Sequence, residues 1–317
     1  MKYFAKKCVA LIITLFLISV ATFLLFQVVP GDPVLLIVGT EDVSPERVEQ
    51  IREQFGLNDG LVTRYFNFVK GIFSGDLGTS YVYRSPVAEL IKDKLLVTLM
   101  LALISVIIIV LVAFPLGIMW ARVTNKYIEA ACNVLTQISM SIPSFFIGIL
   151  VIYIFSIILN VFVAGRYVSY DEDFLGFISY LIFPAIAISL PKIAMVARFL
   201  RNAMLDEMNK DYVRTAYSKG CSKNRVMYLH VLRNALIPVL TFMGVIVAEA
   251  VAGSIVVEQV FGVPGIGRLL ISSISNRDYP VVQILILYMA AAVIIIYFIL
   301  DVVYRIVDPR IRRNMTL

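Results

Sequence analysis

The segment Asp211–Pro238 reads DYVRTAYSKGCSKNRVMYLHVLRNALIP and separates two apolar stretches that are long enough to span a membrane. Its charged residues make it too polar to cross the hydrocarbon core itself. Connections between packed helices are normally only a few residues long. A long, helix-forming and cationic connection therefore predicts a docking surface for another protein on the cytoplasmic side of the membrane.

The bulk composition places the rest of the chain in the membrane. Apolar residues make up 60% of the 317 residues and charged residues 16%, whereas soluble domains contain about half and about a quarter. A spanning helix needs about 20 apolar residues, and its backbone groups must be satisfied within the segment. Six segments meet this length and predict an all-α integral membrane protein. They are Cys8–Val29, Leu95–Ala121, Ala130–Ala164, Phe174–Leu190, Asn234–Val257 and Tyr279–Leu300.

The distribution of Lys and Arg predicts the orientation of these spans. With six spans and a cytoplasmic N-terminus, 18 of the 28 basic residues fall on the inner side, in agreement with the positive-inside pattern. Both termini are then cytoplasmic, and the net charge of +6 reflects topology. No basic face on a soluble domain is available for a nucleic acid. The first apolar run exceeds the length of a signal peptide core, so we expect a retained first helix.

Residues suited to metal binding or redox chemistry are few. Cys8, Cys132 and Cys221 share no ligand-like spacing, so the sequence predicts neither a disulfide framework nor a metal site. His230 is the single histidine, and a metal site needs several converging ligands. We therefore interpret His230 as a structural hydrogen-bonding residue.

Two local patterns predict where helices begin and bend. Ser44 followed by Pro45 is typical of a helix start, and Gly56 ends that pattern, which predicts a small cap on the outer face. The third apolar segment runs for 35 residues without a charge and contains Pro143. It exceeds one straight span, so we expect a tilt, a kink or a part outside the core. Further breaks are possible at Pro115, Pro184, Pro191 and Pro238.

Within the cytoplasmic segment, the residues from Asp211 to Gly220 predict a short helix that ends in a sharp turn. Thr215 and Ala216 are small, and small side chains would let the groove of another protein approach the helix closely. Gly220 can adopt the positive φ that ends such a helix.

The sequences Asp211–Ala216 and His230–Pro238 resemble the coupling motif of permease subunits of bacterial ABC importers, in the dipeptide, oligopeptide and nickel class. The general form of this motif is Glu-Ala-Ala, three further residues and Gly. Here Arg214 and Thr215 stand in the places of Glu and the first Ala. This departure is usual in the peptide class.

The resemblance covers nearly the whole chain. Further matching motifs are Pro30–Pro33, Phe55–Leu57, Gly75–Ser80, Ser141–Phe145, Ala197-Arg198, Met204-Leu205, Gly253–Gly267 and Asn276–Pro280. Two departures lie on the outer side, at Asn58–Gly60 and at Leu96, where the class often has proline.

The resemblance implies the type I ABC importer permease fold, with six transmembrane helices and a small extracytoplasmic segment between the first two. The implied divisions are an N-terminal transmembrane helix (residues 1–29), the extracytoplasmic segment (30–94), the permease core (95–305) and a cytoplasmic tail (306–317). The protein would lie in the bacterial cytoplasmic membrane.

The resemblance also implies partners, namely a second homologous permease, two cytoplasmic ABC ATPases and an extracytoplasmic solute-binding protein. The ATPases would carry ATP and Mg²⁺, because this chain has no G-x-x-x-x-G-K-[ST] phosphate loop. The chain itself is expected to bind no cofactor and to catalyse no reaction. The residues implied in ATPase coupling are Asp211, Tyr212, Arg214, Thr215, Ala216, Lys219 and Gly220.

Candidate residues for a translocation pathway follow from the apolar segments. Glu249 is the one acid inside the fifth span, and an intramembrane carboxylate is a functional-site candidate by default. A packing role has equal weight, because the sequence offers no intramembrane basic partner. Arg198 and Arg201 are interpreted as inner-interface anchors that snorkel toward lipid phosphates. The remaining pathway candidates are Ser141, Pro143, Ser254 and Glu258.

The expected substrate is a di- or oligopeptide, and nickel or a metal chelate is the alternative within the same class. From a different class, the rival is an ion-coupled secondary transporter with Glu249 as proton carrier. Such proteins often show inverted repeats and several ionisable groups near the midplane, and the cytoplasmic segment would then be unexplained. A membrane enzyme would need clustered catalytic side chains, which the sequence does not offer.

Overall fold

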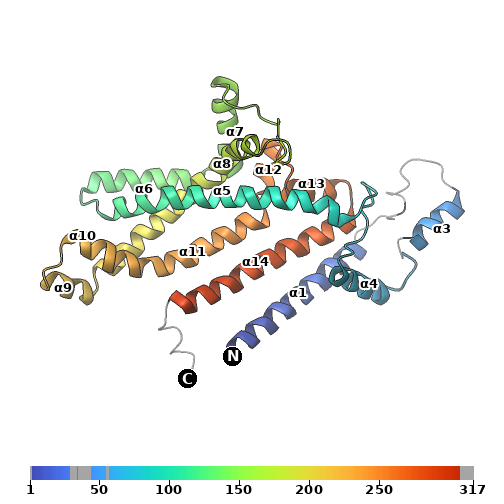
Figure 1. Ribbon diagram of the computed structural model, residues 1–317, viewed down its shortest axis with the longest axis horizontal. Coiled ribbons are helices and arrows are strands. Elements are labelled where there is room, and N and C mark those ends of the chain that lie inside the picture. Colours follow the sequence, from blue (N-terminus) through green and yellow to red (C-terminus); the bar gives the residue numbers. More distant parts are fainter. Residues whose placement is uncertain (1, 29–33, 35–43, 55–56, 308–317) are drawn as a thin grey trace. The chain divides into compact units, whose positions relative to one another are not determined.

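The computed structural model describes residues 2–28, 34, 44–54 and 57–307, and within them it is helical apart from loops and one isolated bridge (Figure 1). The chain forms two compact units. Residues 1–98 and 264–294 make up the first unit, and residues 99–263 and 295–317 make up the second. The Pro30–Pro33 motif, the predicted helix end at Gly56 and the tail beyond residue 307 lie outside the described residues.

The helices divide between the two units as follows. The first unit contains α1 (Lys2–Val28), α3 (Pro45–Gln54), α4 (Leu61–Ser74) and α13 (Ile266–Ser275). The second contains α6 (Lys126–Ser141), α7 (Ser144–Val151), the π-helix η1 (Ile152–Ile158), α8 (Phe174–Met208), α9 (Asp211–Ser218), α10 (Lys223–Arg225), the π-helix η2 (Val226–Leu232), α11 (Arg233–Ala252) and α12 (Ile255–Phe261). Two long helices, α5 (Val87–Ala121) and α14 (Tyr279–Val307), each contribute to both units.

Five helical runs among the described residues are long and apolar enough to cross a membrane. They are Lys6–Gln27, Val87–Ala121, Phe174–Met208, Lys223–Ala252 and Tyr279–Val303. Two further helix pairs, α6 with α7–η1 and α12 with α13, pass the same test only as broken spans and raise the number to at most seven. The six expected spans fall within this range.

In the first unit, α4 packs on α1 through aromatic contacts. The ring of Tyr65 meets Phe23 edge-on at a centroid distance of 5.4 Å, and its hydroxyl shares a 2.8 Å hydrogen bond with Ser19. The predicted helix start at Ser44 is confirmed, because the amide of Arg47 donates to Ser44 Oγ at 3.4 Å at the beginning of α3.

In the second unit, the core lies where α5, α8 and α11 pack together. Its buried members include Ile109, Ala113, Val196, Leu200, Ala235 and Val239. Gly117 of α5 is needed for this packing, because a Cβ there would lie 2.9 Å from the backbone oxygen of Ala197 in α8. The absence of a side chain at Gly117 therefore lets two spans of the unit approach closely.

The proline at residue 143 behaves differently from the other prolines of the second unit. The backbone is extended at Pro143, with φ −61° and ψ 141°, and α6 and the α7–η1 run are bent by 93° at this point. The kink expected in the third apolar segment is thus confirmed. By contrast, α5, α8 and α11 continue through their prolines without a break, at Pro115, Pro184, Pro191 and Pro238.

Candidate functional site

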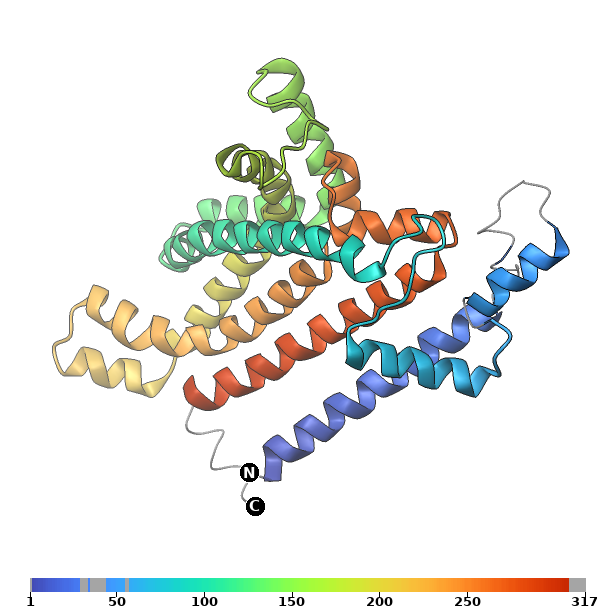
Figure 2. The ribbon, with the colours of Figure 1, turned by 45° about the vertical axis from the view of Figure 1, so that its right-hand side comes forward.

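The segment between α8 and α11 begins, as predicted, with a short helix, α9, which follows the end of α8 and precedes α10 and η2 (Figure 2). Its apolar residues Val213 and Ala216 are buried, at 3% and 8% exposure, in the core of the second unit. One polar face of the helix is exposed, and the spacing of its residues is that of a single helix face. This face consists of Asp211, Arg214, Thr215 and Ser218.

Helix α9 ends in a glycine-stabilised turn. Gly220 has a φ of +78°, its amide donates to the carbonyl of Tyr217 at 2.9 Å, and the amide of Cys221 donates to the carbonyl of Ala216 at 3.2 Å. These two bonds are the Schellman pattern, in which the left-handed residue is usually glycine. A side chain at Gly220 would meet no atom within 4 Å, so the glycine is required by backbone conformation and not by close packing.

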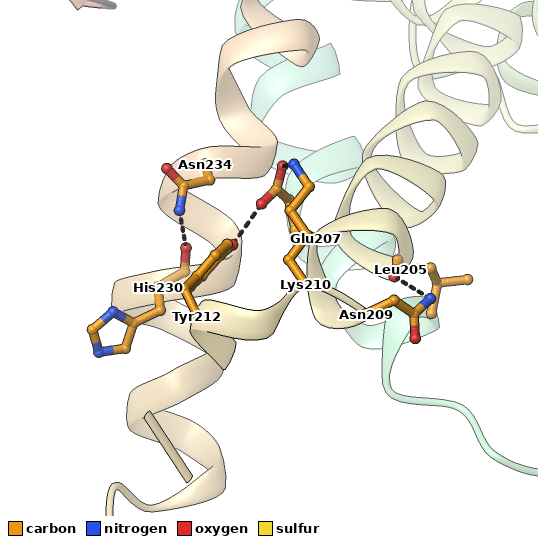
Figure 3. A network of polar contacts seen from close by, with 7 residues as sticks. All are labelled: Leu205, Glu207, Asn209, Lys210, Tyr212, His230 and Asn234. Carbon is orange, nitrogen blue, oxygen red and sulfur yellow. Dashed lines mark hydrogen bonds and ion pairs between the residues drawn. The ribbon is translucent and has the colours of Figure 1, made fainter. Parts of the chain in front are cut away.

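A polar network fixes the start of α9 to the end of α8 (Figure 3). The hydroxyl of Tyr212 donates to Glu207 Oε2 at 2.5 Å, and Lys210 forms an ion pair with the same carboxylate. Burial and the hydrogen bond to Glu207 raise the pKa of Tyr212 to about 12. Tyr212 is therefore a neutral hydrogen-bond donor at physiological pH.

The structure changes the interpretation of Ala216. The sequence suggested that this small residue lets another protein approach α9, but its side chain points into the second unit and packs in its core. The reason is that α9 is amphipathic, so its apolar side must pack on its own chain. Among the residues predicted for coupling, Asp211, Arg214, Thr215, Lys219 and Gly220 are exposed, Tyr212 is half-buried and Ala216 is buried.

A cavity of about 440 Å³ lies in the second unit at the points where helices break. Its lining comes from both sides of the Pro143 break, from α8 around Pro191 and from the α11–α12 junction at Gly253. The lining residues are Ile142, Ser144, Ile188, Pro191, Lys192, Met195, Glu249, Ala250, Gly253, Ser254, Ile255, Val256 and Val257.

An ion pair lies in this cavity. Lys192 Nζ is 2.5 Å from Glu249 Oε2, and the two side chains are 20% and 60% exposed. The sequence-based statement that Glu249 has no intramembrane basic partner is therefore wrong. The predicted fourth span ended at Leu190, before Pro191, whereas α8 continues through that proline and carries Lys192 to the cavity.

The other pathway candidates occupy three different environments. Ser254 lines the cavity with Glu249, and Pro143 forms the helix break beside it. Ser141 is exposed, outside the cavity lining, and donates to the carbonyl of Gln137 at 2.8 Å. Glu258 is fully buried within α12.

Comparison with known proteins identifies the family. Residues 113–313 match the family described as binding-protein-dependent transport system inner membrane component, and residues 1–102 match its N-terminal domain. The chain belongs to this family. It is a multi-pass inner-membrane permease of the ABC importer class, in which the permease is a non-catalytic subunit.

The permease is similar to named transport proteins along its whole length. A Brucella abortus protein, provisionally named a peptide transport system permease, is 38% identical over 97% of this chain and 98% of its own length. The oligopeptide transport system permease protein AppB of Bacillus subtilis is 36% identical over 98% of both chains. The glutathione transport system permease protein GsiC of Escherichia coli is 36% identical over 98% of this chain and 99% of its own.

Arg198 and Arg201 of the permease contact other side chains of the protein, whereas the sequence predicted that they anchor it to lipid phosphates. Arg201 of α8 forms an ion pair with Glu129 of α6, and its guanidinium lies 5.0 Å from the ring centroid of Trp120 in α5. Arg198 Nη1 donates to Gln137 Oε1 at 3.0 Å. Arg201 therefore connects three helices of the second unit through charge and stacking.

A buried junction in the first unit of the permease joins two motifs that are about 200 residues apart. Asp278 is fully buried and accepts hydrogen bonds from the hydroxyl of Ser80 at 2.5 Å and from the amide of Tyr81 at 3.0 Å. Burial raises the pKa of the neighbouring Tyr81 phenol to about 12. Both motifs match the family by resemblance, which assigns neither a role, and these hydrogen bonds show that each motif fixes the position of the other.

Proposed function

We propose that the permease is one transmembrane subunit of an ATP-dependent importer that carries di- and oligopeptides across the cytoplasmic membrane. The support comes from relatives named for peptide, oligopeptide and glutathione transport, which align over nearly the whole chain. Glutathione is itself a tripeptide, so the three names share one substrate chemistry.

The observation that carries the coupling mechanism is the construction of α9. The apolar side of the helix is buried against its own unit, its end is fixed by the Gly220 turn, and its polar face is left exposed. A helix held in this way would move together with a bound subunit and would transmit that movement to α8 and η2. We assign the exposed residues Asp211, Arg214, Thr215 and Lys219 to contact with a cytoplasmic ATPase.

The proposed assembly contains a second homologous permease, two ATPases and an extracytoplasmic binding protein that delivers the peptide. ATP and Mg²⁺ belong to the ATPases, because this chain has no phosphate-binding loop. In the membrane, the five long helical runs and the broken α6–η1 run give six spans, with both termini and α9 on the cytoplasmic side. The α12–α13 pair then forms a re-entrant segment.

The substrate assignment is tested by uptake of a labelled dipeptide and of labelled nickel in cells that lack only this chain. We expect loss of dipeptide uptake, recovery on complementation with the intact chain and no change in nickel uptake. Loss of nickel uptake alone would keep the importer mechanism and replace the substrate with a metal or metal chelate.

The coupling assignment is tested by copurification of the ATPase with variants of the exposed face. We expect Arg214→Glu to lose the ATPase while inserting normally, because the substitution reverses the charge of an exposed side chain. Lys126→Glu is the matched control, since it makes the same charge change at an exposed residue of α6. Equal ATPase recovery in both variants would remove the role assigned to α9.

A further inference from the structure

The strongest unexplained feature of the permease is the convergence of three helix irregularities on the Lys192–Glu249 cavity. The chain is extended at Pro143 between α6 and α7. It leaves helical geometry again at Gly253, with φ 110° and ψ 137°, between α11 and α12. Pro191 removes one backbone donor from α8. All three positions lie at or beside the cavity of about 440 Å³.

Such a convergence has a physical meaning in a membrane protein. Backbone groups that leave helical geometry cannot face lipid, so irregular backbone at membrane depth is found where it is buried in protein or lines a cavity. Transporters place substrate sites at such broken helices. The volume of this cavity also falls within the range of about 300–1,000 Å³ that is usual for small-molecule sites.

The charged lining of the cavity is one ammonium and one carboxylate. Apart from Lys192 and Glu249, the lining side chains are apolar or are the hydroxyls of Ser144 and Ser254. The Glu249 side chain is 60% exposed in spite of its ion pair. Within this chain the Glu249 carboxylate is therefore accessible from the cavity that it lines.

We propose that Lys192 and Glu249 form a binding site for the zwitterionic ends of a short peptide in the translocation pathway. Lys192 binds the terminal carboxylate and Glu249 binds the terminal ammonium. This inference rests on the proposed function, and it adds the residues and the substrate feature that they recognise. Without substrate, the two side chains neutralise each other, which lowers the cost of keeping charges at membrane depth.

The paired arrangement selects for ligands that carry both charges. A ligand with only a carboxylate or only an ammonium takes one partner and leaves the other charge without a counterion, because no other charged side chain among the described residues lines the cavity. A zwitterion replaces the internal pair with two new pairs, so no charge is left alone. Both side chains are long and rotatable, and they can separate to reach the two ends of the ligand.

The test measures the selectivity of transport, because a merely structural ion pair would affect all substrates equally. The complete importer is reconstituted in liposomes with its binding protein preloaded with a dipeptide, with its N-acetylated form or with its C-amidated form. Uptake is expressed per ATP hydrolysed. The variants are Lys192→Met and Glu249→Gln, and Lys126→Met is the matched control for loss of a lysine outside the cavity.

We expect the wild-type importer to prefer the unmodified dipeptide over each blocked form. Lys192→Met should lower the preference over the C-amidated form by about fivefold or more, and Glu249→Gln should do the same for the N-acetylated form. In each variant the other preference should change little, and Lys126→Met should change neither. Stimulation of ATP hydrolysis by the loaded binding protein shows that each variant is assembled and coupled.

Two outcomes would overturn the inference, and they are distinguishable. If the wild-type importer transports the peptides and neither Lys192→Met nor Glu249→Gln changes the uptake of any of them, the zwitterion site is wrong and the proposed function stands. Equal losses for all three peptides in both variants would reduce the pair to a structural contact. If the wild-type importer transports none of the peptides, the proposed function itself fails.

Discussion

Two carboxylates of the permease, Asp278 and Glu249, differ in burial and in the groups that bind them. The difference separates a carboxylate that stabilises the fold from one that is accessible to a ligand. Asp278 is fully buried and accepts hydrogen bonds from a hydroxyl and a backbone amide. Glu249 has one flexible partner, Lys192, and 60% of its side chain is exposed. The first carboxylate is held by groups that cannot leave without unfolding a loop, whereas the second can exchange its partner for a ligand.

The same contrast is found on neighbouring residues of α9. Ala216 is buried in the core of the second unit and Thr215 is exposed on the polar face. Adjacent residues of one short helix therefore differ in that Ala216 packs in the core, whereas Thr215 belongs to the exposed face for which docking is proposed. Placing the same charged side chain at each of the two positions tests whether their roles differ.

The largest effect is expected from Asp278→Ala. The substitution leaves the buried Ser80 hydroxyl and the Tyr81 amide without their acceptor, at a cost of about 2–4 kcal/mol for two unsatisfied donors. Thermal unfolding of the purified permease in detergent measures the loss. Asp59→Ala, at an exposed residue of the same unit, is the control, and an equal melting temperature for both variants would contradict a structural role for Asp278.

A comparable loss of stability is expected from Ala216→Glu. A carboxylate placed in the core of the second unit has no described basic partner there, and detaching α9 to expose it should cost about 3 kcal/mol. Thr215→Glu makes the same charge change one residue away. It should leave the melting temperature unchanged while reducing ATPase copurification. If Thr215→Glu lowered the melting temperature and Ala216→Glu did not, the buried and exposed faces assigned to α9 would be wrong.

Gly220 tests the turn that ends α9. Gly220→Val should cost about 1–2 kcal/mol, because a β-branched residue is strained at a φ of +78°. Gly220→Asn should cost much less, since asparagine tolerates this conformation. If the two variants melted at the same temperature, the backbone requirement at Gly220 would be disproved.

The smallest effect is expected from Tyr212→Phe, which removes the hydrogen bond to Glu207 and should cost about 1 kcal/mol. Because the folded-state pKa of Tyr212 is raised from 10 to about 12, its contribution is complete below pH 10 and is lost as pH rises from 10 through 12. Melting curves at pH 8 and pH 10.5 measure this change. The wild type should lose more stability than Tyr212→Phe over that interval, and identical losses would exclude Tyr212 as the source.

Several features were predictable from the sequence because they depend on neighbouring residues. The apolar spans, the start of α3 at Ser44, the bend at Pro143 and the turn at Gly220 each follow from local composition or from the conformational limits of one residue type. The polar face of α9 was predictable in part. The short helix was expected, but the inward direction of Ala216 was not, since a helix of eight residues does not reveal which side meets its own chain. A docking role for its exposed residues stays a prediction.

What the sequence by itself determined is a helical membrane permease with a short amphipathic helix between two of its spans, because hydropathy and short-range conformation specify both. Only the tertiary structure decided the partners of the key carboxylates. Lys192 reaches Glu249 across 57 residues of chain, and Ser80 reaches Asp278 across 198. Such pairs depend on how helices pack and where they continue through a proline. Local sequence does not encode that arrangement, so the role of each acid became clear only from the groups that surround it.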